Sequence, residues 1–174
     1  AVASLNRVFN AMQPITRMQF DTFATPMLAH YPYVRMAGYQ RMVADADRAQ
    51  FETARLAIQP GFRIRVFADG RMMPAPRRPY YRVVDYMMPM AENARVFGLD
   101  AQSRPEQTVA VERSCTTGAA AMTDQFNVIE NRRTVPGFMI FMPVFRPAAV
   151  SGRGAAGCAL ADGFTAVGFL SETL

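Results

Sequence analysis

The hydrophobic pattern of this chain changes from a helical period to a period of two at Pro60-Gly61, and this change limits the folds open to it. Before that point, apolar residues recur at steps of three and four, as they do along one side of a helix. After it, apolar and polar residues alternate, as in strands with one buried face. Helices followed by strands, with one further helix among the strands, predict an α+β fold around an antiparallel sheet.

Two long helices are expected before Pro60. The first segment is apolar along one side and is interrupted at Pro14, because proline lacks the N–H group and clashes with the preceding helical turn. Thr25-Pro26 is a candidate second boundary, since threonine suits an N-cap and proline suits the first turn. The apolar side comprises Leu5, Val8, Phe9, Met12, Ile15, Phe20, Phe23 and Met27. Such a stripe needs a partner, and a second copy of the chain is the expected one.

The second helix is predicted over residues 34–59. Ala37, Ala44, Phe51 and Ile58 recur every seven residues, as in a seam that packs along another helix. Pro60-Gly61 ends this helix. The chain is therefore expected to divide into a helical stalk or dimerisation region over 1–60 and a sheet-based region over 61–174.

Strands are expected after Pro60. A strand is predicted over 62–66, because alternating apolar residues there are followed by Asp69-Gly70, a hairpin-turn signal. Ser103 and Glu106 have the spacing of a capping box and open a helix that Gly118 closes. Further strands are predicted over 80–88, 122–129, 138–145 and 164–170, with a mobile loop rich in alanine and glycine over 146–163.

Composition excludes several classes of function. The chain has 174 residues, of which 51% are apolar, so it can form the core of one domain. It has no run of about 20 apolar residues, as a membrane-spanning helix would need, and it begins without methionine, as a segment of a longer protein would. All 19 basic residues are arginine, and the densest group, 71–82, contains prolines that predict a solvated loop and not a nucleic-acid surface. No metal site, cofactor or catalytic group is predicted, because two cysteines and one histidine cannot complete a usual zinc site and no nucleophile has a neighbouring base.

Short motifs along the chain resemble those of the CHASE domain family. Gln40-Arg41-Met42-Val43, followed by Asp47-Arg48 and Phe51-Glu52, is similar to the family's helix signature. The later matches are Tyr81 to Pro89 with Asn93, Gly98-Leu99-Asp100, Thr117-Gly118, Pro143-Val144-Phe145, and a closing strand from Gly163 to Phe169. Each match is short, but they follow in the family's order across about residues 36–170. On this resemblance the chain is identified as a member of the family.

The resemblance implies a long N-terminal helix and a PAS-like antiparallel sheet that holds a small ligand. It also implies a periplasmic location in an inner-membrane receptor, with flanking transmembrane helices and a cytoplasmic histidine kinase or diguanylate cyclase. Plant cytokinin receptors of the same family hold their adenine-type ligand with an aspartate just before the aromatic strand. That place falls at Arg78 or Pro79 here, and neither side chain can accept a hydrogen bond, so cytokinin is not the expected ligand.

The strand over 80–88 is the expected ligand-binding strand. Alternate residues of a strand face the same way, so Asp85 would face opposite to Arg82 and Tyr86. Asp85 must be paired with an arginine, exposed, or available to a ligand N–H group, whereas Arg82 and Tyr86 would favour an anionic ligand. The candidate ligand-binding residues are Tyr81, Arg82, Val83, Asp85, Tyr86, Met88, Thr123, Phe126, Phe138, Ile140 and Met142. Ordinary core packing is the alternative for the apolar members.

Two alternatives remain open from the sequence. Cys115 and Cys158 could form a disulfide, which an extracytoplasmic site permits, but a buried helix position for Cys115 and a loop position for Cys158 favour free thiols. The function predicted is that of a ligand-binding sensor, not an enzyme. The alternative is a structural dimerisation or protein-interaction module without a small-molecule ligand.

Overall fold

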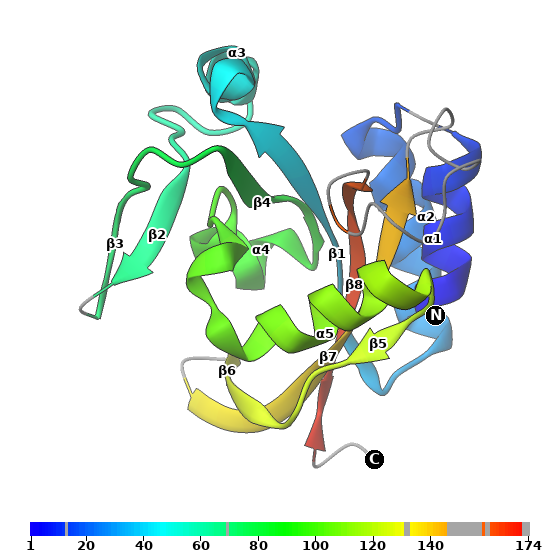
Figure 1. Cartoon of the computed structure of the whole chain (residues 1–174). Helices are drawn as coiled ribbons and strands as arrows, with labels where there is room; N and C mark the ends of the chain where they lie inside the picture. Colours follow the sequence, from blue (N-terminus) through cyan, green and yellow to red (C-terminus); the bar gives the residue numbers. More distant parts are fainter. Residues whose placement is uncertain (13, 69, 131–132, 146–157, 159–160, 172–174) are drawn as a thin grey trace.

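A computed structural model describes residues 1–12, 14–68, 70–130, 133–145, 158 and 161–171. Two N-terminal helices, α1 (Val2–Ala11) and α2 (Arg17–His30), lie side by side against one face of a sheet (Figure 1). The helix α5 (Pro105–Thr117) crosses the opposite face. We call these two sides the α1–α2 face and the α5 face. The fold is thus α+β, as predicted, with helices on both faces of the sheet.

The main sheet is antiparallel and has six strands in the order β4-β1-β8-β7-β5, with β6 also paired to β7. Its strands are β1 (Val34–Ala44), β4 (Tyr80–Met88), β5 (Ala121–Met122), β6 (Phe126–Glu130), β7 (Arg133–Phe145) and β8 (Ala161–Leu170). A separate hairpin consists of β2 (Arg65–Ala68) and β3 (Arg71–Pro74). Shorter helical segments are η1 (Asp45–Asp47), α3 (Arg48–Arg55), α4 (Met90–Asn93), η2 (Ala94–Val96) and η3 (Ala101–Ser103).

The predicted helix over 34–59 is wrong for most of its length. Its first part is β1, which pairs with β4 on one side and β8 on the other, and only Arg48–Arg55 within the range is α-helical. Most of β1 is buried on both faces, so its apolar and polar residues do not alternate, and local periodicity does not separate such a strand from a helix. Gly38 and Tyr39 are poor helix formers, and they sit in the closely paired centre of this strand. The boundary at residue 60 therefore does not separate helices from the sheet.

The two N-terminal helices separate near Pro14, as predicted, but Thr25-Pro26 is not a boundary. The second helix begins after Thr16, whose side chain accepts a hydrogen bond from the backbone N–H of Gln19, while the Gln19 side chain accepts one from the N–H of Thr16. Pro26 lies inside this helix. Its ring removes one helical N–H donor, and it is exposed, so water can hydrate the carbonyl left without that donor.

The elements predicted after residue 60 are largely confirmed. Tyr80–Met88 is a strand that ends at Pro89, and a hairpin turns at Gly70. The helix α5 ends at Gly118, whose φ of +67° is the left-handed conformation that glycine adopts readily. The capping box is wrong, because the Ser103 hydroxyl donates to the Asp100 carbonyl and no side chain caps α5. The predicted loop over 146–163 lies largely outside the described residues.

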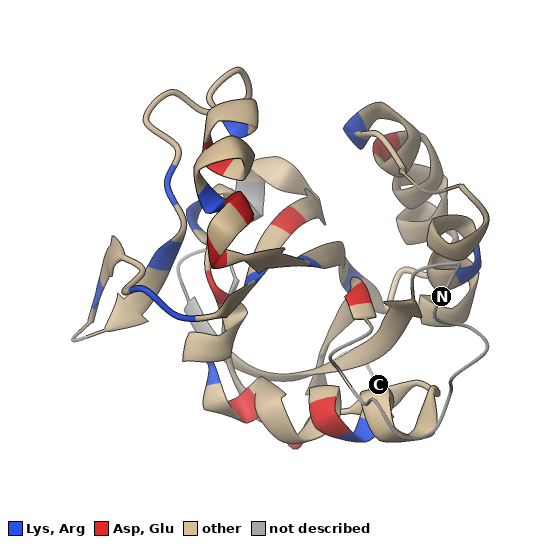
Figure 2. Cartoon of the chain, turned by 45° about the horizontal axis from the view of Figure 1, so that its top comes forward, with Lys and Arg blue, Asp and Glu red and all other residues tan. Residues whose placement is uncertain are grey.

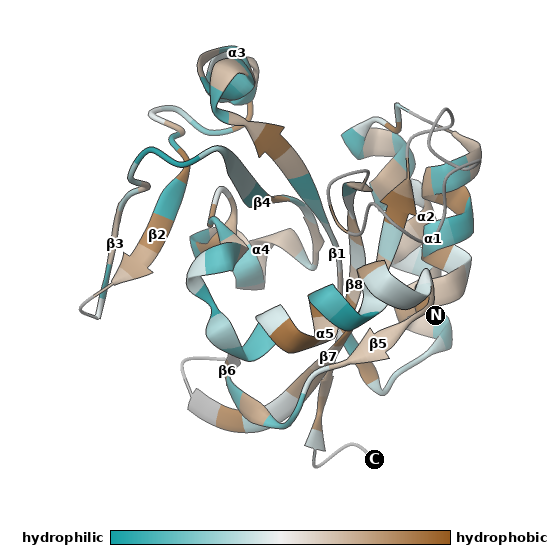
Figure 3. Cartoon of the chain, viewed as in Figure 1, coloured by the Kyte–Doolittle hydropathy of each residue, from teal (hydrophilic) through white to brown (hydrophobic). Residues whose placement is uncertain are grey.

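The apolar stripe of the N-terminal helices packs on the chain's own sheet. Leu5, Phe9 and Phe20 are buried against Tyr39 and Tyr86. Ala110 and Val111 of α5 pack on the opposite face with residues of β7 and β8. Figure 3 shows hydrophobic residues on strands of the sheet and both hydrophilic and hydrophobic residues along the helices that cover it. Most of the stripe is therefore satisfied within one molecule and does not itself require a second copy.

Candidate functional site

A β-bulge at Asp85 changes the direction of the side chains along β4. Tyr39 of β1 pairs with Tyr86, but the next residue, Gln40, pairs with Val84, so Asp85 has no opposite partner. Paired residues share a face, so Tyr86 lies on the α1–α2 face with Tyr39. Strict alternation had placed Tyr86 on the same face as Arg82, and that prediction is wrong because the bulge adds one residue to the strand.

Three arginines surround Asp85, and we call these four residues the Asp85 cluster. The Asp85 carboxylate is fully buried, with Arg41 Nε at 2.6 Å and Arg55 Nη2 at 2.7 Å from Oδ2. Arg17 Nη2 donates to the Asp85 backbone carbonyl at 2.6 Å. Burial is the largest single effect on the pKa of Arg41 and lowers it, but the charge and hydrogen bond of Asp85, together with Tyr39 and Tyr86, raise that pKa overall. The interpretation of Asp85 as an ion-pair partner is confirmed, and its carboxylate is already occupied.

The Asp85 cluster connects the N-terminal helices and α3 to the sheet. Arg17 belongs to α2 and Arg55 to α3, whereas Arg41 and Asp85 belong to neighbouring strands. The Arg17 guanidinium lies 5.1 Å from the ring centroids of both Tyr86 and Phe97, within cation–π range. Figure 2 shows acidic and basic residues close together on α3 and β4. A displacement of β4 at Asp85 would therefore be felt by α2 and α3 together.

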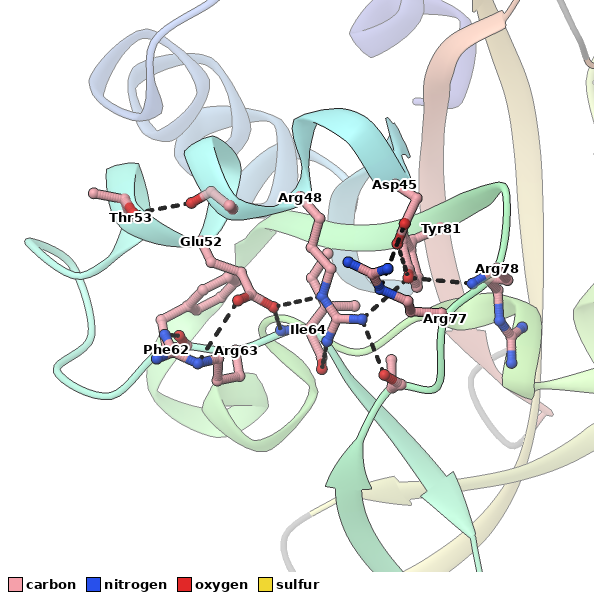
Figure 4. Close-up of polar contacts among 12 residues, drawn as sticks. Asp45, Arg48, Glu52, Thr53, Phe62, Arg63, Ile64, Arg77, Arg78 and Tyr81 are labelled. Atoms are coloured by element: carbon pink, nitrogen blue, oxygen red, sulfur yellow. Dashed lines mark hydrogen bonds and ion pairs between the residues drawn. The ribbon is translucent and has the colours of Figure 1, made fainter.

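A second ion network fixes α3 to β4 and the chain before β2 (Figure 4). Glu52 Oε1 accepts hydrogen bonds from Arg48 Nε and from the backbone N–H of Ile64, both at 2.9 Å. Arg48 Nη1 also donates to the Tyr81 hydroxyl, which in turn donates to Asp45 Oδ1 at 2.6 Å. Arg48 and Glu52 are the second residues of the Asp-Arg and Phe-Glu motifs noted in the sequence, and in this structure they hold α3 in place.

Substitution of Glu52 by alanine is expected to destabilise the domain by about 3 kcal/mol, because a buried N–H group and a cation lose their acceptor together. Urea unfolding followed by circular dichroism measures the loss. Glu112→Ala, on the exposed side of α5, is the matched control and should change stability by less than about 0.5 kcal/mol. Equal effects of the two substitutions would show that the network does not hold α3.

A buried polar cluster of Gln40, Arg82 and Gln107 lies on the α5 face. The Arg82 side chain is 3% exposed, and its Nη2 donates to the Ala101 carbonyl at 2.7 Å. Arg82 Nε and Gln40 Oε1 are both buried without a hydrogen-bond partner among the described residues. Gln40 Nε2 donates to Gln107 Oε1 at 3.2 Å, and Gln107 Nε2 points at the sulfur of Met139 at 3.6 Å, a weak acceptor. The cluster thus holds one unused donor and one unused acceptor.

The carboxylate of Asp100 acts on the charge of Arg82 but forms its own contacts with other groups, and its Oδ2 has no hydrogen-bond partner among the described residues. Asp100 Oδ1 accepts the backbone N–H groups of Arg82 and Gln102, and Oδ2 lies 3.2 Å from Arg78 Nη1. Among the described residues, no carboxylate forms an ion pair with the Arg82 guanidinium. Burial lowers the pKa of Arg82 to about 10, and the charge of Asp100 offsets only part of that effect. Arg82 therefore remains a cation that the surrounding residues compensate incompletely.

The other predicted ligand-binding residues are divided between the two faces of the sheet. Phe138, Ile140, Met142 and Met88 pack on the α1–α2 face, and Phe126 packs on the α5 face. Tyr81 and Val83 are buried in a core with Phe62 and Ile64. The Thr123 hydroxyl accepts the backbone N–H of Met139. These residues do not line one common cavity, and a ligand-binding role for them remains a prediction.

Gln40 and Gln107 were not among the residues predicted from the sequence to bind a ligand. Gln107 lies in the buried stripe of α5 with Ala110, Val111 and Ser114, at helical spacing. A polar residue in an otherwise buried stripe is the signal that could have identified it. Gln40 gave no comparable signal, because its strand was predicted as part of a helix and Gln40 lies outside the apolar seam of that helix.

Cys115 and Cys158 form a disulfide, so the interpretation as free thiols is wrong. The bond joins α5 to the chain shortly before β8. Within the described part of the chain, no group of three or more His, Cys, Asp or Glu side chains could hold a metal ion. None of its helices has both the length and the apolar character needed to span a bilayer.

Comparison with models of protein families gives a match. The family model described as "CHASE domain" matches residues 13–174. A search among curated proteins finds no significant match. The matched range includes the Asp85 cluster, the network around Glu52, and the buried polar cluster on the α5 face.

Proposed function

Because this chain belongs to the CHASE domain family of extracytoplasmic sensory domains, we propose that it binds a small molecule on the α5 face of its sheet. Binding is passed across the membrane to a cytoplasmic histidine kinase or diguanylate cyclase through flanking transmembrane helices. In the intact receptor this domain is the periplasmic part of an inner-membrane protein. The antiparallel sheet with a helix across one face supports its description as PAS-like.

The observation that carries this proposal is the buried polar cluster. Arg82 Nε and Gln40 Oε1 are unpartnered among the described residues, although both lie in the interior. Nearly all buried polar groups in folded proteins are hydrogen-bonded, so unused ones need a specific explanation. A ligand that supplies the missing partners is the explanation that also fits a sensory domain.

The Asp85 cluster supports a route for the signal. Arg82 and Asp85 are close along β4, so a ligand that changes the position of this strand acts on the bulge directly. The bulge is bound to Arg17 of α2 and to Arg55 of α3. A ligand can shift this arrangement only by binding one position of the strand better than the other.

The second candidate function is a dimerisation module without a small ligand. A groove of about 580 Å³ runs between α1 and α2 and is lined mainly by apolar side chains, including Val8, Phe23 and Met27. Met12 and Met18 beside it are 45% and 75% exposed. This surface favours a homodimer through the N-terminal helices α1 and α2, and it is compatible with either function.

Thermal unfolding in the presence of a library of small metabolites tests the proposed function. A ligand at 100 times its dissociation constant stabilises the folded state by about 2.7 kcal/mol, which corresponds to roughly 5–10 °C in Tm for a chain of this length. Gln40→Leu should lose this shift, whereas Met18→Ala, in the groove between α1 and α2, should keep it. If no compound raises the Tm while Met18→Arg converts a dimer to a monomer, the domain is a dimerisation module.

A further inference from the structure

We propose that the ligand is a small monocarboxylate, whose anionic group binds Arg82 and whose own O–H or N–H group donates to Gln40. This inference rests on the proposed function, that a small molecule binds on the α5 face. It adds the chemical class of that molecule and the two side chains that recognise it.

The charge of Arg82 favours an anionic ligand. Burying a cation without a paired anion is costly, so such groups are normally paired or lie at functional sites. Arg82 Nη2 donates a hydrogen bond to the Ala101 carbonyl, whereas Arg82 Nε–H has no acceptor among the described residues. The free Nε–H can donate to a carboxylate oxygen, and a charge-assisted hydrogen bond of this kind is about twice as strong as a neutral one.

The net charge at the site favours a ligand with a single negative charge. Asp100 already contributes a carboxylate next to the Arg82 backbone, and its own cation is Arg78. The unused charge on the α5 face is therefore a single positive one. A phosphate dianion would bring two negative charges to this place, close to Asp100, whereas a monocarboxylate matches the one cation.

The unpartnered Oε1 of Gln40 favours a ligand that also carries a hydrogen-bond donor. The amide of Gln40 uses its Nε2 to donate to Gln107, which leaves Oε1 as an acceptor without a donor. Acetate alone would leave it unsatisfied. A hydroxy, amino or amide group on the ligand would supply the missing hydrogen.

The relative position of Gln40 and Arg82 limits the distance between the carboxylate and the donor group of the ligand. Gln40 is opposite Val84, and Arg82 is opposite Met42, so Gln40 and Arg82 are diagonal neighbours on one face of the sheet. Such neighbours are about 7–8 Å apart at the backbone. The Arg82 guanidinium carbon lies 5.8 Å from the centroid of the Phe141 ring on β7, so this side chain extends across the sheet beneath α5. A carboxylate and a donor separated by a few bonds fit this spacing.

The experiment is a thermal-shift comparison of paired probes. Aliphatic, aromatic and amino-acid monocarboxylates, among them glycolate, L-lactate and acetate, are each tested beside the corresponding amide. The proteins are the wild type, Arg82→Met and the control Arg113→Met, whose arginine is exposed on α5. We expect at least one carboxylate with a donor group to raise the Tm of the wild type and the control by several degrees. Its amide and the Arg82→Met protein should show no shift.

Arg82→Met should also be more stable than the wild type without any ligand. Replacing a poorly compensated buried ion by an apolar side chain is expected to raise the Tm by about 3–6 °C. The Ala101 carbonyl keeps a second donor, the N–H of Arg104, and Asp100 keeps Arg78. A fall in Tm of similar size would overturn the inference, because Arg82 would then be a structural cation satisfied within the fold.

The remaining outcomes separate the inference from the function on which it rests. If amides raise the Tm as much as their carboxylates, or if the shift survives in Arg82→Met, the ligand class is wrong but a small-molecule sensor remains. If neither the paired probes nor the metabolite library shifts the wild type, both proposals fail. The unpartnered groups would then be satisfied by water.

Discussion

Replacing Asp85 by asparagine is expected to lower the unfolding free energy of the domain by about 3 kcal/mol, near the lower end of the range for a broken buried ion pair. The substitution keeps the size of the side chain but removes the charge that holds Arg41 and Arg55. Two arginines would then lie close together without a carboxylate. The two side chains retain 23% and 17% exposure, so water screens part of the repulsion and the largest values in that range are not expected.

Urea denaturation of Asp85→Asn against the wild type measures this effect. Asp124→Asn removes the same charge from an exposed position and should change stability by less than about 0.5 kcal/mol. Because the Asp85 carboxylate holds Arg55 of α3, the variant should also expose backbone amides of α3 to faster hydrogen exchange, whereas Arg17 of α2 keeps its bond to the Asp85 backbone carbonyl. A stability close to that of the control would show that the Asp85 cluster is not a tight connection, and the signalling route would lose its basis.

Loss of the disulfide between Cys115 and Cys158 is expected to have a similar or larger effect. The two cysteines are 43 residues apart, and closing a loop of that length stabilises the folded state by about 4 kcal/mol in the chain-entropy account. The bond also fixes α5, which covers the buried polar cluster. Its removal should therefore weaken ligand binding as well as stability.

The double variant Cys115→Ala/Cys158→Ala tests this expectation by thermal unfolding, with the wild type in a reducing buffer as the matched comparison. Both should unfold at a lower temperature than the oxidised protein, by roughly 8–16 °C for a loss of this size in a domain of this length. Should the reduced wild type unfold at the same temperature as the oxidised protein, the disulfide would contribute nothing measurable to the fold. The accompanying effect on the ligand would then have no cause in this bond.

Much of the fold after residue 60 could be predicted from local patterns. Alternation, prolines and glycines marked the strand that ends at Pro89 and the helix that ends at Gly118, because these signals act over a few residues. The strand over Val34–Ala44 could not be recognised in the same way. It is buried on both faces, and its identity depends on pairing with β8, at the other end of the chain. Long-range pairing of this kind is not encoded in a local period.

The candidate site was predicted only in part, for a related reason. Arg82 was identified as a possible anion-binding residue, and Asp85 as a residue that must be paired, exposed or available to a ligand, from the cost of burying charge. The bulge at Asp85 could not be recognised from the sequence, so Tyr86 was placed on the wrong face. Gln40 and Gln107 meet only when α5 crosses the sheet, and no spacing within either segment indicates that contact.

The position of β1 between β4 and β8 affects how the protein can be made. The sheet cannot close until residues 161–170 are available, because β8 supplies the partner of both β1 and β7. During secretion, the first helices and β1 would therefore leave the export channel long before their covering strand. Their apolar side chains and unpaired strand edges would be exposed to other chains in that interval. Premature termination before β8 should therefore yield aggregates instead of a smaller folded domain.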